Sequence, residues 1–220
     1  MKIFTIPGLD TNFYQHDYSQ SISSDTNALY EKIKENLLTN TKDFKILDFG
    51  TGNGILLIML AKDFPYFSYI GIEIFPDLVE IANQNFMSLE KNLQLSIDYE
   101  IIEADYSMLC AVLNTKQKYD LIISNPPYYP PNSGKQSIDL HKAASRFEIY
   151  ANLYDLLSSI KNYLANTGKA YVIFPASRKE EFVTHCNRLC LDTTYHYNTS
   201  DYTSEKKMKI IFELKHADIS

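Results

Sequence analysis

The sequence predicts an α/β fold, a doubly wound, mostly parallel seven-stranded sheet with an antiparallel edge strand. The first observation is that short apolar segments alternate with helical patterns from residue 44 onward. The second is that two strand-like segments close the chain with no helical pattern between them. The third is that conspicuous glycine and acidic residues fall where the expected strands end, and such sheets bind their ligands there.

The 220 residues fit a single domain. Residues 1–25 are polar and aromatic without a clear period, which indicates an N-terminal loop or lid. Ser23, Ser24 and Asp25 can cap a helix over about 26–38, within a leading helical segment 26–43.

The remaining elements follow from apolar periodicity and from turn residues. The expected strands are 44–49, 69–74, 99–103, 119–124, 169–174, 193–198 and 208–214. The expected helices are 55–62, 76–89, a stretch ending near 113, 147–164 and one that begins at 177. Gly168 is expected as the C-cap of the long helix, and Ser177 with Glu180 as a capping box for the next helix.

Composition and charge narrow the function classes. A hydrophobic fraction of 45% and a charged fraction of 22% exclude a disordered chain. Three cysteines without a C-x-x-C pair indicate reduced thiols, with no disulfide and no metal site. A net charge of −6 excludes bulk electrostatic coating of nucleic acid but permits a local basic patch. With no long apolar span and no apolar leader, we expect a cytoplasmic protein. The oligomeric state does not follow from the sequence, and a monomer is the favoured expectation.

A glycine-rich turn closes the first of the alternating strands. Asp48 precedes Gly50, Thr51, Gly52 and, one residue further, Gly54. Glycines at alternate positions let a backbone approach a ligand closely. A dinucleotide needs the spacing G-x-G-x-x-G, but Ile55 stands at the last position. The G-x-G-x-G form after an acidic residue resembles motif I of class I S-adenosylmethionine-dependent methyltransferases. This resemblance implies S-adenosyl-L-methionine as cofactor, a Rossmann-like methyltransferase fold, and Asp48 facing the cofactor amino group.

Acidic residues also end the next two expected strands. Glu73 can accept both hydroxyls of a ribose. In the methyltransferase class that the sequence resembles, the acid at the following strand end reaches the adenine amino group, which implicates Ala104 and Asp105. We therefore expect a cofactor site that is completed by further residues, namely Asp25, Ile74 and Asn125.

The fourth strand ends in Asn125, Pro126, Pro127 and Tyr128. This run resembles the N-P-P-Y motif of methyltransferases that modify planar amino nitrogens, either adenine N6 or a glutamine amide. The Asn125 side chain and the Pro126 carbonyl can each accept one N–H of the amino group, and the Tyr128 ring can stack on the planar group. We expect Asn125, Pro126 and Tyr128 to be catalytic, with Pro127 as a substrate contact.

A closer resemblance extends beyond these motifs, to the bacterial tRNA adenine-N6 methyltransferase family that modifies the adenine beside the anticodon of a valine tRNA. It rests on residues 125–129, 143–148 and 168–175, and on an entry segment at 13–17 followed by Ser24 and Asp25. It implies an RNA substrate, with Tyr129, Lys142 and Arg146 as contacts. Further cations are Lys135, Arg178 and Lys179, and a tail group of Lys206, Lys207 and Lys209.

Two alternatives remain open. A release-factor glutamine methyltransferase shares motif I and N-P-P-Y but carries a helical substrate domain before motif I, where this sequence has 43 residues before Phe44. A cofactor-binding adaptor without catalytic activity is the second alternative, and the intact Asn125 and Tyr128 argue against it.

Overall fold

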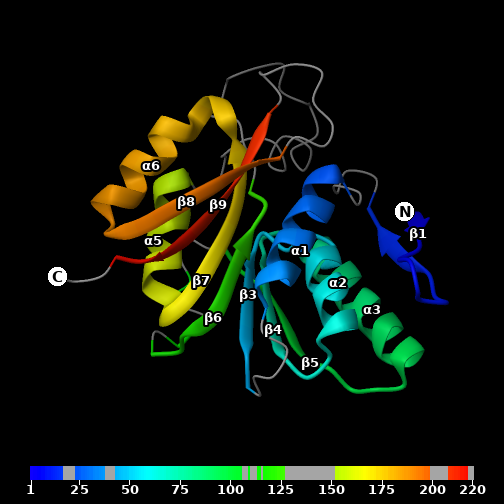
Figure 1. The fold of residues 1–220 in the computed structure, drawn as a ribbon. Helices are drawn as coiled ribbons and strands as arrows, with labels where there is room; N and C mark the ends of the chain where they lie inside the picture. Colours follow the sequence, from blue (N-terminus) through cyan, green and yellow to red (C-terminus); the bar gives the residue numbers. More distant parts are fainter. Residues whose placement is uncertain are drawn as a thin grey trace.

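The central strands β3 (Lys45–Phe49) and β6 (Tyr119–Ser124) are almost wholly buried, as their apolar sequences require. Strands with this character need helices over both faces. In Figure 1, α1, α2 and α3 cover one face of the sheet, and α5 and α6 cover the other. These helices are α1 (Ser24–Asn36), α2 (Ile55–Asp63), α3 (Pro76–Leu93), α5 (Leu153–Tyr163) and α6 (Lys179–Arg188).

The structure is a computed structural model, and it describes residues 1–16, 23–37, 43–105, 109, 113–114, 116–126, 152–198 and 208–217. The other strands are β1 (Lys2–Phe4), β2 (Phe13–Gln15), β4 (Ser68–Glu73), β5 (Asp98–Glu103), β7 (Leu164–Pro175), β8 (Leu191–Asn198) and β9 (Lys209–His216). None of the helices within these ranges is long and apolar enough to cross a membrane.

The seven strands of the main sheet run in the order β5-β4-β3-β6-β7-β9-β8. Strands β3 to β7 pair in parallel, whereas β9 pairs antiparallel with both β7 and β8. This arrangement confirms the predicted doubly wound sheet with an antiparallel pair at one edge. The last strand of the chain inserts next to β7, so the edge position falls to β8.

The register brings the carboxyl ends of the parallel strands together. Phe49, the last residue of β3, lies opposite Ile72 on β4 and opposite Ser124, the last residue of β6. Glu73 at the end of β4 lies opposite Glu103 at the end of β5. The motifs that follow β3, β4, β5 and β6 therefore meet at one edge of the sheet.

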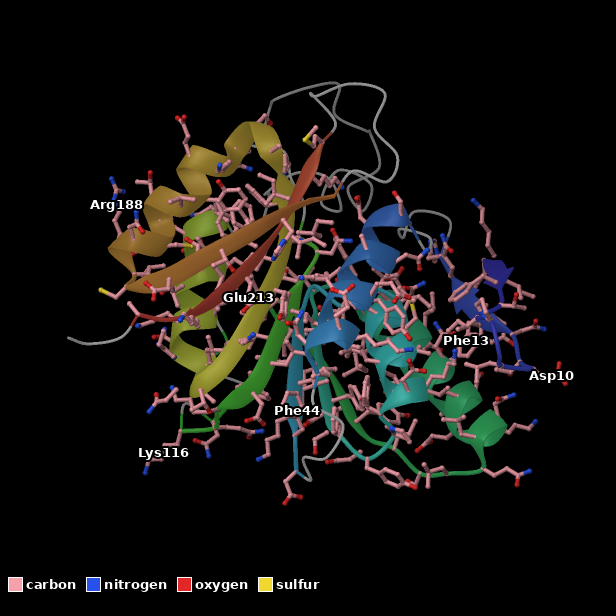
Figure 2. All side chains as sticks on the ribbon, viewed as in Figure 1. Asp10, Phe13, Phe44, Lys116, Arg188 and Glu213 are labelled. Atoms are coloured by element: carbon pink, nitrogen blue, oxygen red, sulfur yellow. The ribbon has the colours of Figure 1, made fainter. Side chains whose placement is uncertain are left out.

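The N-terminal segment differs from the expected loop. Residues 2–4 and 13–15 pair as a separate two-stranded antiparallel sheet, in which Ile3 lies opposite Tyr14. Phe4 and Phe13 hold the strands together with ring centroids 5.7 Å apart. In Figure 2, Phe13 lies toward the helices and Asp10 lies at the outer end of this hairpin. Helix α1 then begins at Ser24, where the Ser23 hydroxyl accepts a hydrogen bond from the Thr26 amide at 3.2 Å.

Gly168 does not cap a helix. Helix α5 ends at Tyr163, and β7 begins at the next residue, so Gly168 lies inside β7. The β6–β7 register shifts between Tyr119 and Leu121. A Cβ atom at Gly168 would come within 2.9 Å of the Tyr119 carbonyl oxygen. The glycine is needed because two backbones approach closely, and helix termination has no part in it.

The predicted capping box at Ser177 is also wrong. Ser177 lies in a short 3-10 turn, η2 (Ala176–Arg178), and α6 begins at Lys179 without a side-chain cap. The Arg178 guanidinium instead donates two hydrogen bonds to Glu181, at 2.8 and 2.7 Å. A capping box does open α5, where Asn152 and Asp155 bond each other's backbone amides. An ion pair therefore begins α6 in place of the expected hydroxyl cap.

Candidate active site

The glycine turn after β3 adopts the left-handed backbone that its sequence predicts. Gly50 and Gly52 have φ angles of +75° and +60°, which L side chains rarely adopt. The amides of Gly50 and Thr51 both donate to the Ile72 carbonyl of β4, at 2.9 and 3.0 Å. No heavy atom of the described residues comes within 4 Å of a Cβ placed on Gly50 or Gly52. The turn is therefore fixed to the sheet, with space beside these two glycines that no side chain of the described residues fills.

The Glu73 side chain, at the end of β4, accepts hydrogen bonds from this turn and from its own strand end. One carboxylate oxygen accepts the Gly52 amide at 2.8 Å, and the other accepts the amides of Ile74 and Phe75 at 2.9 and 3.1 Å. The side chain is buried. Burial raises the pKa of the carboxyl group, and the three amide hydrogen bonds oppose that rise. A carboxylate at the predicted position thus organises the turn that we expect to bind the cofactor.

Asp48 is the last residue but one of β3 and is also buried. Desolvation raises the pKa of Asp48 to about 7, and the neighbouring negative charge of Glu73 adds to the rise. The nearby Thr51 side chain acts in the opposite direction. Two buried acids therefore lie beneath one turn, and a cationic ligand group beside them would favour their charged forms.

Ala104 and Asp105 follow β5 and lie next to Glu73. The Ala104 amide donates to the Glu73 carbonyl oxygen at 2.9 Å. Both residues are half-buried, as is Ile74. The structure therefore brings Asp48, Glu73 and Asp105 to consecutive strand ends, in the arrangement expected from the sequence.

The end of β6 is tied to the end of β3 by a residue that sequence reasoning missed. The buried Ser124 hydroxyl donates to the Phe49 carbonyl oxygen at 2.9 Å. Phe49 and Ser124 are register partners, so the next residues, Gly50 and Asn125, leave the sheet from neighbouring strand ends. Asn125 is half-buried and Pro126 is buried. Pro127, Tyr128, Tyr129, Lys142 and Arg146 lie outside the described residues.

Asp25 lies in the first turn of α1, where its carboxylate accepts a hydrogen bond from Lys209 at the start of β9. Both side chains are largely buried. Burial lowers the pKa of Lys209, and the ion pair with Asp25 counteracts that shift. The sequence alone groups Lys209 with the cations of the tail. The structure shows it instead as the partner of a predicted site residue.

Arg178 and Lys179, two further expected cations, also have protein partners. Arg178 bonds Glu181, as described above. Lys179 donates to the Tyr195 hydroxyl at 2.6 Å, and its ammonium group lies 3.9 Å from the centre of the same ring. Lys135, Lys206 and Lys207 lie outside the described residues.

Asn85 is the second residue that sequence reasoning missed. It lies on the buried face of α3 and donates to the Asn53 carbonyl oxygen of the glycine turn at 2.9 Å. The signal in the sequence is a polar residue within the apolar stripe of a helix, which is formed by Leu78, Ile81, Ala82, Phe86 and Leu89.

A family model described as a methyltransferase domain matches residues 40–214. The chain belongs to the methyltransferase-domain family. The match contains β3 to β8 and most of β9, and hence the ends of β3, β4, β5 and β6 that supply the candidate site.

Curated relatives and solved structures agree with this placement. The methyltransferase domain is 31% identical over 153 residues to a protein of Vibrio campbellii named tRNA1(Val) (adenine(37)-N6)-methyltransferase, covering 66% of this chain and 60% of that one. It is 31% identical over 144 residues to a release factor glutamine methyltransferase of Flavobacterium psychrophilum, covering 64% and 46%. A methyltransferase from Pyrococcus furiosus shares the fold, with a TM-score of 0.62, 16% identity and coverage of 96% and 91%.

Proposed function

We propose that this methyltransferase domain methylates N6 of an adenine in RNA, using S-adenosyl-L-methionine, and that the adenine lies beside the anticodon of a valine tRNA. The observation that carries the proposal is the bond from Ser124 to Phe49, 2.9 Å long. It joins the strand end that precedes Asn125, the proposed acceptor for the amino group, to the strand end that precedes the glycine turn, which would hold the methyl donor. A tRNA substrate also implies a cytoplasmic location.

The residues at the glycine turn fit S-adenosyl-L-methionine. The open space beside Gly50 and Gly52 allows a ligand to approach the backbone. A cationic group of the ligand would favour the charged form of Asp48, and Glu73 lies where a carboxylate is expected to accept the ribose hydroxyls. Thr51, Gly54, Ile74, Ala104 and Asp105 complete the proposed cofactor contacts. When bound, the cofactor supplies an electrophilic methyl group on a sulfonium sulfur.

The chain's own residues bind and orient the amino group. An exocyclic amino nitrogen is a weak nucleophile because its lone pair is delocalised into the ring. The Asn125 side-chain oxygen accepts one N–H and the Pro126 carbonyl accepts the other, which favours the electron redistribution that makes the nitrogen nucleophilic. Tyr128 stacks on the base, and catalysis comes from positioning, with no general base of special pKa.

The RNA substrate is supported by the relatives named for tRNA adenine methylation. Their matched regions amount to 60% and 55% of their own lengths. Tyr129, Lys142 and Arg146 remain the predicted substrate contacts. Since the net charge is −6, we propose recognition of a shaped stem–loop with an accessible adenine, and little affinity for duplex in general.

A second candidate is N5-methylation of a glutamine side chain in a peptide chain release factor. Its support is the relative with that name, at the same 31% identity. A glutamine amide is also planar, so Asn125 and Pro126 could orient it in the same way. The match covers 46% of that relative, against 60% of the tRNA-modifying one, and we therefore place adenine first.

Mass spectrometry of cells with and without the protein separates the two candidates. We expect N6-methyladenosine to disappear from digested total tRNA when the protein is absent, with release factors still methylated. Loss of methylglutamine from release factors, with tRNA nucleosides unchanged, would overturn the adenine assignment and select the second candidate.

A further inference from the structure

Asn85 is a fully buried amide in the middle of an apolar helix face. Its exposed fraction is 0%, and its neighbours on the buried face of α3 are apolar. A buried amide of this kind costs stability unless its polar atoms all have hydrogen-bond partners. Three hydrogen bonds of the Asn85 side chain offset the cost of burying its amide group.

Two of these bonds join Asn85 to the N-terminal hairpin. The Tyr14 amide donates to Asn85 Oδ1 at 2.6 Å, and Asn85 Nδ2 donates back to the Tyr14 carbonyl oxygen at 2.9 Å. The side-chain amide thus pairs with Tyr14 as a residue of an adjacent strand would. It fixes β2 to α3, although the two residues are 71 positions apart in sequence.

The third bond fixes the glycine turn. Asn85 Nδ2 also donates to the Asn53 carbonyl oxygen at 2.9 Å, while the Gly54 amide donates to the Thr51 carbonyl oxygen at 3.0 Å. The Asn53 carbonyl and the Gly54 amide belong to the same planar peptide unit. Both of its polar groups are therefore held, so the unit cannot rotate without breaking one of these bonds.

We infer that Asn85 is a positioning residue, which sets the backbone of the glycine turn and couples it energetically to the N-terminal hairpin. The inference rests on the proposed function in that the turn binds the cofactor. In this arrangement, residues 1–16 support the backbone of the cofactor site. A second contact strengthens the attachment of the hairpin, because Lys62 of α2 donates to the Pro7 carbonyl oxygen at 2.9 Å.

Hydrogen exchange with mass spectrometry tests the coupling in the full-length protein. Asn85→Leu keeps the size of the side chain and removes its hydrogen bonds. Asn83→Leu is the matched control, because the Asn83 amide bonds only the Val79 carbonyl within α3 among the described residues. Without ligand, we expect faster exchange in both the hairpin and residues 50–54 of Asn85→Leu, with Asn83→Leu close to wild type.

A cofactor-dependent measurement distinguishes positioning from a merely structural role. S-adenosylhomocysteine should slow exchange of residues 13–16 in the wild type and in Asn83→Leu, but not in Asn85→Leu. Its affinity, measured by calorimetry, should fall about tenfold in Asn85→Leu, as expected for the loss of one or two hydrogen bonds.

Unchanged exchange in residues 50–54 of Asn85→Leu would overturn the inference, and Asn85 would then anchor the hairpin alone. If Asn85→Leu does not fold, Asn85→Asp decides by the same criterion, because it keeps the acceptor for Tyr14 and loses both donor bonds. If the wild type binds no S-adenosylhomocysteine, the proposed function fails, whereas the ligand-free comparison still decides the coupling.

Discussion

The carboxylate of Glu73 has one observed role and one proposed role. It accepts three backbone amides, one of them from Gly52 in the turn, and we propose that it also accepts the hydroxyls of the cofactor ribose. The sequence predicts the second task from the position of an acid at a strand end. The first task could not be predicted, because it depends on how the turn folds back over β4. Glu73 therefore shapes the site even without a ligand.

Replacing Glu73 by Ala should weaken S-adenosylhomocysteine binding by about 1–3 kcal/mol, since hydrogen bonds to a charged acceptor are lost. Calorimetry measures this change. Glu103→Ala is the matched control, because Glu103 is the exposed acid opposite Glu73 on β5. Equal affinities in Glu73→Ala and the wild type would remove Glu73 from the cofactor site.

Asp48 makes stability depend on pH in a defined direction. Its pKa is raised to about 7 in the folded protein from a reference value of 3.8. Between these two pKa values the Asp48 carboxyl group keeps its proton in the folded state and loses it in the unfolded state, so each rise in pH favours unfolding. The contribution of Asp48 to the free energy of unfolding is therefore fully present below the unfolded-state pKa and is lost as the pH rises through about 7.

The free energy of unfolding of the wild type should thus fall, relative to Asp48→Asn, by roughly 2–3 kcal/mol between pH 5 and pH 8. Denaturant unfolding of both proteins at the two pH values measures the difference. Asp48→Asn is the appropriate reference because it has the same shape and cannot ionise. Parallel pH profiles for the two proteins would contradict the assigned burial of the Asp48 carboxyl group.

At the scale of elements, the parallel strands and their carboxyl ends follow from the sequence, whereas several boundaries do not. The buried strands β3 and β6 are short apolar runs, and Pro76 marks the first turn of α3. The prediction that Gly168 caps a helix is wrong, because a glycine that follows an apolar helical stripe has the same sequence pattern as a C-cap. Its actual constraint is the nearby backbone of β6, more than 40 positions away in sequence.

Alanine substitutions at Gly71 and Gly168 distinguish damage to the glycine turn from damage to the sheet. A Cβ at Gly71 would lie 2.7 Å from Thr51 Cγ2, beneath the glycine turn, whereas one at Gly168 would meet backbone carbonyls at the start of β6. Both Ala variants should lose about 1–3 kcal/mol of stability through overpacking. Only Gly71→Ala should also bind S-adenosylhomocysteine more weakly, by about tenfold.

Thermal unfolding and calorimetry on the two purified variants test this contrast. Equal losses of affinity in Gly71→Ala and Gly168→Ala would show that affinity follows global stability and that Thr51 has no specific part in the site.

At the scale of the whole molecule, the sheet order decides which motifs meet. The order β5-β4-β3-β6 brings the ends of four strands together, and motif spacing alone indicates this assembly correctly. The partnership of Asn85 with Tyr14, and that of Asp25 with Lys209 across 184 positions, could not be predicted. Such contacts depend on the packing of separately formed elements, and no periodic pattern encodes them. The N-terminal hairpin was missed for the same reason.

The most direct test of the central claim is the rate at which purified protein methylates an unmodified valine tRNA transcript in the presence of S-adenosyl-L-methionine, followed by mass spectrometry of the nucleosides. We predict that the wild type forms N6-methyladenosine and that Asn125→Ala is slower by at least about a hundredfold, with S-adenosylhomocysteine affinity nearly unchanged. Near-normal turnover by Asn125→Ala, or a wild type that methylates release-factor glutamine and leaves the tRNA unmodified, would contradict the account.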